Sequence, residues 1–243
     1  MPSAASSPPP TLPASSASPA GPSVEARGGD VLGAAPRILW GIVAVCAVFG
    51  MCGSFVQTVG TALSTADGPG LATNVVRYLS YFTILTNLFV ALVAVSLTVG
   101  RRPGALLRVL TLNGVTGIVI TGVVNWFLLR PGCVIAPGVP TLLDSVQHIV
   151  VPVIAPIVWL VIGPRGFVHA RTLLASLIFP LAYLAWTLVH GAATGWYPYP
   201  FIDIPTVGYA SALTVGGLIL VIMCVLAVLC WAWDRWRVRR ARA

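Results

Sequence analysis

Six long apolar stretches dominate the chain and restrict what it can fold into. They cover approximately residues 37–60, 77–99, 105–129, 145–162, 171–190 and 207–233. Each is close to the roughly 20 residues that a helix needs to cross a hydrocarbon core about 30 Å thick. Backbone groups in lipid find no water to bond, so a single apolar stretch must satisfy them as a helix. The pattern predicts an all-α polytopic membrane protein with six transmembrane helices.

Charged residues are too few for a soluble domain of ordinary composition. Hydrophobic residues make up 57% of the 243 and charged residues 8%, whereas soluble domains average about half apolar and a quarter charged. The net charge of +8 comes from arginines in the connections between apolar stretches, without a basic stripe interleaved with aromatic residues. We therefore expect membrane lipids as partners and no nucleic acid.

The distribution of the basic residues predicts the orientation. All fourteen are arginine, which is typical of a GC-rich bacterial genome. Twelve of them precede the first stretch or follow the second, fourth and sixth, and only Arg77 and Arg130 flank the other side. Because basic residues concentrate in cytoplasmic loops, we expect a multi-pass protein of the cell membrane with both termini in the cytoplasm.

Two terminal segments flank the six-helix domain of residues 37–233. Residues 1–36 are rich in Pro, Ala, Ser and Gly, and such a composition buries too little apolar surface to offset the entropy of ordering. They are predicted to form a disordered cytoplasmic tail. Residues 234–243 contain five arginines and are predicted to form a basic cytoplasmic tail.

A polar stripe interrupts the second apolar stretch. In RYLSYFTILTNLF, residues 77–89, the hydroxyls of Ser80, Thr83 and Thr86 recur at every third position. Asn87 follows one helical turn after Thr83. On a continuous helix these side chains share one face, and in lipid that face must meet protein or a cavity.

Three other stretches carry polar groups at a similar level. Asn125 ends the third, Asp144 and His148 lie one turn apart at the start of the fourth, and His190 ends the fifth. With the predicted orientation and a rise of about 1.5 Å per residue, all of them fall in the outer third of the bilayer. We predict a polar site there, shared by four spans.

A hydroxyl beside an imidazole is the minimum for nucleophilic catalysis, because the imidazole takes the proton of the attacking alcohol. A histidine inside an apolar span is costly and is a functional-site hypothesis by default. At this depth the substrate would be a lipid ester entering from the outer leaflet. The candidate roles are Ser80 or Thr83 as nucleophile, His148 as general base, Asp144 or His190 as its orienting group, Asn87, Asn125 or Ser80 as oxyanion donors, and Thr86 as a supporting residue.

Two other interpretations compete with a hydrolase. Hydroxyls within spans often bond to the carbonyl four residues back or to a neighbouring helix, as in a non-catalytic lipid-binding or structural protein. His148 and His190 could instead be axial ligands of a haem, which is the less favoured alternative. The five cysteines show neither a Cys-x-x-Cys pair nor metal spacing, so we expect free thiols, no metal and no cofactor.

Three segments resemble a known family. Residues 183–203, YLAWTLVHGAATGWYPYPFID, resemble the Trp-x-x-x-His, Thr-Gly and Tyr-Pro-Phe pattern of the androgen-induced and androgen-dependent membrane proteins and their bacterial six-span relatives. RYLSYFT in the second stretch and HIVVP in the fourth extend the resemblance over most of the chain after residue 37.

The resemblance implies an activity and two of its residues. Animal members are similar to threonine hydrolases that cleave fatty acid esters of hydroxy fatty acids, with a threonine early in the second span and a histidine early in the fourth. The histidine corresponds to His148. An ungapped match to YLSY puts the nucleophile at Ser80, whereas matching threonine to threonine selects Thr83 after a shift.

Overall fold

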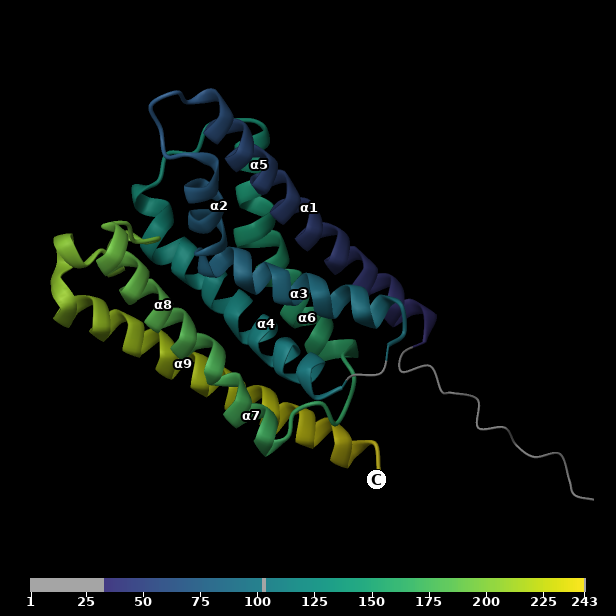
Figure 1. The fold of residues 1–243 in the computed structure, drawn as a ribbon. Coiled ribbons are helices and arrows are strands. Elements are labelled where there is room, and N and C mark those ends of the chain that lie inside the picture. The colour runs from purple at the N-terminus through teal and green to yellow at the C-terminus, as the bar shows by residue number, and fades with distance from the viewer. Residues whose placement is uncertain (1–32, 102–103, 243) are drawn as a thin grey trace, which may run out of the picture.

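The computed structural model describes residues 33–101 and 104–242, and these residues form helices and connections without a strand (Figure 1). The predicted disordered tail lies outside the described residues as far as residue 32, and its last three residues already belong to the first helix. The elements are α1 (Ala34–Ser64), α2 (Leu71–Leu79), α3 (Phe82–Thr98), α4 (Ala105–Val124), η1 (Asn125–Leu129), η2 (Arg130–Gly132), α5 (Val139–Ser145), η3 (Val146–Val150), α6 (Val151–Ile162), α7 (Ala170–Ser176), α8 (Ile178–Thr194), η4 (Pro200–Ile202) and α9 (Ile204–Arg240).

Five helical runs in the described chain are long and apolar enough to cross a membrane. They are Ala34–Ser64, Ala105–Gly132, Val139–Ile162, Ala170–Thr194 and Ile204–Arg240, and α2 with α3 makes a sixth if that bent pair counts as one span. The all-helical class and the membrane character predicted from the sequence are thus confirmed, with five or six spans. The predicted boundary at residue 234 falls inside α9, which carries the basic residues onward as helix.

Large apolar side chains cover the outside of the bundle. Along α9, Leu218, Val221, Val225 and Leu229 are all exposed. Soluble monomers rarely expose apolar surface on this scale, whereas lipid chains cover it without cost. The outer faces therefore fit a membrane.

The bundle packs around α3, which contacts α1 on one side and α4 on the other. Its apolar core is built on large side chains such as Trp40, Leu97, Ile118 and Trp159, each at most 1% exposed. Figure 1 shows α8 and α9 running side by side along one flank of the molecule, with α1 on the opposite flank. The buried polar side chains of α3, by contrast, are Thr83, Thr86 and Asn87, all in its first two turns.

The second predicted span is broken at Ser80 and Tyr81. Tyr81 is extended, with φ −78° and ψ 128°, and α2 and α3 meet at a bend of 68°. The prediction that Ser80 shares a continuous helical face with Thr83 is therefore wrong. Two side chains of α8 hold the break, because Tyr183 donates its hydroxyl to the Ser80 carbonyl at 3.1 Å and Trp186 donates Nε1 to Ser80 Oγ at 3.0 Å.

The connection after α8 returns across this break. Gly195 ends α8 in the left-handed conformation, with φ 71°, which glycine adopts without steric cost. Trp196 then packs edge-on against Tyr81, with ring centroids 5.7 Å apart, and lies under the Arg77 guanidinium at 5.2 Å. These contacts fix the connection over the start of α3 and bring Tyr199 to it.

A buried carboxylate fastens the opposite end of the bundle. Asp234 of α9 is 1% exposed, and its two oxygens accept the backbone N–H groups of Gly166 at 2.9 Å and Val168 at 2.8 Å. The turn between α6 and α7 is thereby attached to α9. Nearby, Arg237 Nη2 donates to the Gly163 carbonyl at 2.8 Å, at the end of α6.

We predict that Asp234→Ala destabilises the protein by about 2–4 kcal/mol, because it leaves two buried backbone N–H groups without acceptors. Asp234→Asn keeps one acceptor oxygen and should lose less. The measurement is the thermal unfolding midpoint of the detergent-solubilised protein. Asp67→Ala, at an exposed loop carboxylate, is the matched control; an equal drop in that variant would contradict a role for the buried contacts.

Candidate active site

Three of the predicted side chains form a continuous line of polar contacts. Thr83 Oγ1 lies 3.2 Å from His148 Nε2, and His148 Nδ1 lies 2.7 Å from Asp144 Oδ1. Thr83 belongs to α3, Asp144 to α5 and His148 to η3. The order hydroxyl, imidazole, carboxylate is that of a nucleophile, its base and the group that orients the base.

The surroundings of His148 determine its tautomer. Nδ1 faces two acceptors of Asp144, the carboxylate at 2.7 Å and the backbone carbonyl at 3.2 Å. Neither of these groups donates when the carboxylate is ionised, so Nδ1 must carry the proton. In the neutral ring Nε2 then holds the lone pair and accepts the hydroxyl of Thr83. This is the arrangement that a general base requires.

A local widening of the helix positions His148. Residues 146–150 form a π-helical turn in which Val151 N–H bonds to the Val146 carbonyl, five residues back. Pro152 has no N–H for the carbonyl of His148, which disfavours a regular α-helical turn here. Gly122 of α4 gives the turn its room, because a Cβ there would lie 2.9 Å from Pro152 Cβ and 3.5 Å from the His148 carbonyl oxygen. Single π turns of this kind are frequent at functional sites.

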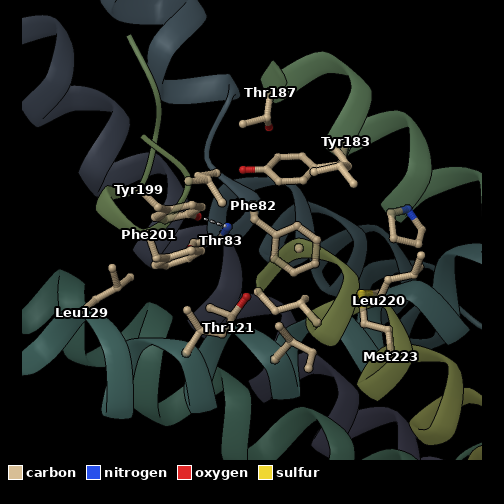
Figure 2. A pocket seen from close by; sticks show the side chains of 17 residues that line it. Phe82, Thr83, Thr121, Leu129, Tyr183, Thr187, Tyr199, Phe201, Leu220 and Met223 are labelled. Atoms are coloured by element: carbon tan, nitrogen blue, oxygen red, sulfur yellow. Dashed lines mark hydrogen bonds between the residues drawn. The ribbon is translucent and has the colours of Figure 1, made fainter. Parts of the chain in front are cut away.

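Thr83 sits in the first turn of α3, where backbone N–H groups have no partner within the helix. Its N–H donates to the Tyr199 hydroxyl at 3.4 Å, as Figure 2 shows. Burial raises the pKa of the Tyr199 phenol, which keeps its proton at neutral pH. The Thr83 N–H, the Tyr199 O–H and the positive end of the α3 dipole thus surround the hydroxyl of Thr83. These are donors of the kind that stabilise an oxyanion.

Two cavities meet at Thr83. The larger, of about 810 Å³, is open and lined by polar groups that include Asn74, Arg77 and His148. The smaller, of about 70 Å³, is lined mainly by apolar side chains of α4, α8 and α9, with Leu220 and Met223 opposite Thr83 (Figure 2). Thr83, Leu129 and Tyr199 line both cavities. A molecule that reaches Thr83 can therefore place a polar part in the first cavity and an apolar part toward the second.

Three other predicted site residues form hydrogen bonds to groups other than His148. They are Ser80, Thr86 and Asn87. Ser80 Oγ donates to the Val76 carbonyl at 2.7 Å and accepts from Trp186. Thr86 Oγ1 is fully buried and lies 2.9 Å from Thr121 Oγ1 and 3.0 Å from the Phe82 carbonyl oxygen. Asn87 Nδ2 donates to the Thr83 carbonyl at 2.9 Å. Their contacts hold the first turns of α3 in place rather than facing His148.

The two remaining predicted residues differ in position. Asn125 begins η1, is buried, and lines the larger cavity together with Thr83 and His148. His190 does not line that cavity. Its ring stacks on Trp186, with centroids 5.2 Å apart, and meets Trp196 edge-on at 5.8 Å. The sequence could not indicate which side of α8 the imidazole of His190 occupies.

Tyr199 is the site residue that sequence reasoning did not assign. It lies in the Tyr-Pro-Tyr-Pro-Phe segment on which the family resemblance rests, so the signal was present without a role attached to it. Its ring stacks on Phe201 at 5.2 Å and packs edge-on against Tyr81 at 5.8 Å. These contacts direct its hydroxyl at the Thr83 N–H.

Comparison of the chain with protein-family models, with curated proteins and with solved structures found no match. The described residues thus define an all-helical protein whose helices are long and apolar enough to cross a membrane. Its candidate site is a histidine in contact with a threonine on one side and an aspartate on the other.

We predict that Gly122→Ala slows the reaction of Thr83 with a fluorophosphonate probe about 10- to 100-fold, because the added methyl group displaces the turn that carries His148. The measurement is the rate of labelling in membranes. Gly60→Ala is the control, since a Cβ at Gly60 meets no atom within 4 Å. Unchanged labelling in Gly122→Ala would show that the position of this turn does not matter.

Proposed function

We propose that this protein is a membrane-embedded threonine hydrolase of lipid esters. The observation that carries the proposal is the contact of Thr83 Oγ1 with His148 Nε2 at 3.2 Å, together with the contact of His148 Nδ1 with Asp144 Oδ1 at 2.7 Å. The sequence left Ser80 and Thr83 as alternatives. The geometry favours Thr83, because the Ser80 hydroxyl is engaged by Val76 and Trp186.

The reaction proceeds in two acyl transfers. Thr83 Oγ attacks the ester carbonyl as its proton passes to His148 Nε2, and Asp144 stabilises the imidazolium that forms. The oxyanion accepts the Tyr199 O–H, and the Thr83 N–H turns to it from the Tyr199 oxygen, its partner at 3.4 Å in the free protein. Collapse expels the alcohol, which takes the proton from His148. Water activated by the same imidazole then cleaves the acyl-threonine, releases the carboxylic acid and restores the Thr83 hydroxyl.

The two cavities support an amphiphilic substrate. An ester carbonyl at Thr83 would place a hydrocarbon segment against the apolar side chains of α8 and α9 and a polar segment in the larger cavity. Arg77 lines this larger cavity. We propose that it faces an anionic group of the substrate, and that the substrate enters from the outer leaflet.

The orientation follows from the distribution of arginine, which we propose reflects the positive-inside rule. Arg37 Nε donates to the Thr98 carbonyl at 3.0 Å, so the start of α1 and the end of α3 lie at one end of the bundle. Arg237 joins the end of α9 to the end of α6. This arginine-rich end would face the cytoplasm of a bacterial cell, with the Thr83 site toward the outside.

A non-catalytic lipid-binding protein is the alternative that the same cavities support. This alternative would be favoured over a hydrolase if the well-folded protein bound lipid while Thr83 did not react with the probe. A haem bound between His148 and His190 is less well supported, because Thr83 and Asp144 occupy both ring nitrogens of His148 and the His190 ring lies against two tryptophans.

We predict that a fluorophosphonate probe labels the wild-type protein in membranes and that Thr83→Ala and His148→Ala abolish the labelling. Ser80→Ala should retain it, with a stability loss of about 1 kcal/mol from the lost hydrogen bonds. Asp144→Ala should label more slowly, yet faster than His148→Ala, because the backbone carbonyl of residue 144 remains to accept the Nδ1 proton. Labelling that survives in Thr83→Ala and disappears in Ser80→Ala would reverse the assignment of the nucleophile.

We expect the loss of Arg77 to weaken substrate binding and to leave the turnover rate almost unchanged. Arg77→Gln should raise KM about tenfold for an ester that bears a carboxylate, through loss of a charge-assisted contact, and leave kcat within about twofold. A neutral ester of the same chain length is the control substrate and should show no change in KM. An equal change for both esters would contradict recognition of an anionic group.

A further inference from the structure

The arginine-rich end of the bundle contains a second concave site, far along α9 from the Thr83 cavities. A cavity of about 730 Å³ lies between the end of α6 and the last turns of α9. Arg165, Arg237 and Arg240 line it, and Trp233 and Trp236 form a wall, their rings stacked with centroids 4.7 Å apart.

Two of these arginines are already held in place. The Arg237 guanidinium donates to the carbonyls of Trp159 at 3.4 Å and Gly163 at 2.8 Å, which uses two of its five N–H donors. Arg240 lies over the Trp236 ring at 4.4 Å. Ordering these long side chains therefore costs a ligand less than ordering free ones would.

Within the part of the chain that the structure describes, none of the three guanidinium groups forms an ion pair with a carboxylate, although the charge of Asp234 acts on Arg237. Among the described residues, Asp234 is the acid nearest in sequence to these last turns of α9, and both of its oxygens accept backbone N–H groups of the turn between α6 and α7. Arg165, on that turn, is exposed and forms no ion pair within the described chain. Guanidinium groups bind phosphate oxygens well because their donors match them in pairs. The positive charge of the cavity therefore favours binding of an anion.

An apolar groove continues from this cavity into the membrane region. Its volume is about 580 Å³, and it shares Leu160, Trp233 and Trp236 with the arginine cavity. It runs between α4, α6 and α9 as far as Leu226. The ten steps along the helix from Leu226 to Trp236 cover about 15 Å, which is about half the thickness of a hydrocarbon core. The groove thus has the length of the acyl chains in one leaflet.

We propose that an anionic phospholipid binds here, with its phosphate among Arg165, Arg237 and Arg240 and its acyl chains in the groove along α9. A free phosphate would use the arginines but leave the groove empty, and a zwitterionic phospholipid would bring its own cation to the arginines. A diacyl lipid with net negative charge matches both parts. The site is independent of the chemistry at Thr83.

The test is lipid binding to the full-length, delipidated protein in neutral detergent, followed by native mass spectrometry. The probe is palmitoyl-oleoyl phosphatidylglycerol, compared with phosphatidylcholine of the same acyl chains and with free glycerol phosphate. We expect phosphatidylglycerol to bind at least about tenfold more tightly than the other two. Equal binding of phosphatidylcholine, or glycerol phosphate binding as tightly as phosphatidylglycerol, would overturn the proposal.

Matched variants separate the site from general surface charge. Arg165→Gln with Arg240→Gln should weaken phosphatidylglycerol binding about tenfold or more, whereas Arg101→Gln with Arg171→Gln removes the same charge at the same end and should change it less than about twofold. Ala232→Trp places a bulky ring in the groove from an exposed position and should also weaken binding. Equal losses in the two double variants, or full binding in Ala232→Trp, would overturn the proposal. Thermal unfolding midpoints confirm that each variant is folded.

Discussion

The break between α2 and α3, held by the hydrogen bonds of Ser80 to α8, is the constraint on which the rest of the site depends. Tyr183 bonds to the Ser80 carbonyl and Trp186 to its hydroxyl, so α8 supplies partners that a continuous helix would not offer. The chain then restarts as α3 with Thr83 in the first turn. An unbroken helix would pair the Thr83 N–H with a carbonyl four residues back and remove it as a donor at the site.

The same break explains why three spans converge on one hydroxyl. The 68° bend opens the polar cavity between α2 and the start of α3. The π turn of η3 directs His148 into that cavity, and the connection after α8 brings Tyr199 over it. Because α8 both holds the break and leads into that connection, the position of Thr83 and the position of its neighbouring donor are linked. Toward the opposite end of the bundle, the helices are joined by an apolar core and by the contacts of Asp234.

Much of the fold could be predicted from sequence because lipid imposes simple rules on length and polarity. The apolar stretches and their arginine flanks indicated helices close to those observed. The spacing of Asp144 and His148 correctly indicated that their side chains would meet. The break at Ser80 could not be predicted, because residues 77–83 contain neither glycine nor proline and its partners lie about a hundred residues later. Because the sequence does not reveal the break, it leaves Ser80 and Thr83 as alternative candidates for the nucleophile.

The remaining site residues show the same limit. For His190 the sequence predicts only a depth in the membrane, and the packing of Trp186 and Trp196 decides where its imidazole lies. Tyr199 lies in a connection without helical periodicity, so no face could be assigned to it. Likewise, the packing of α6 against α9 decides which residues line the arginine cavity. In each case the missing information is tertiary contact between distant segments rather than local propensity.

The central claim is that Thr83 is the nucleophile, and locating a covalent adduct tests it most directly. Protein labelled with a fluorophosphonate in membranes would be digested with trypsin, and the peptide of residues 78–101, which contains Ser80, Thr83 and Thr86, would be sequenced by tandem mass spectrometry. The account predicts an adduct on Thr83 that is absent from His148→Ala. An adduct on Ser80 or Thr86, or a well-folded protein without any adduct, would contradict it.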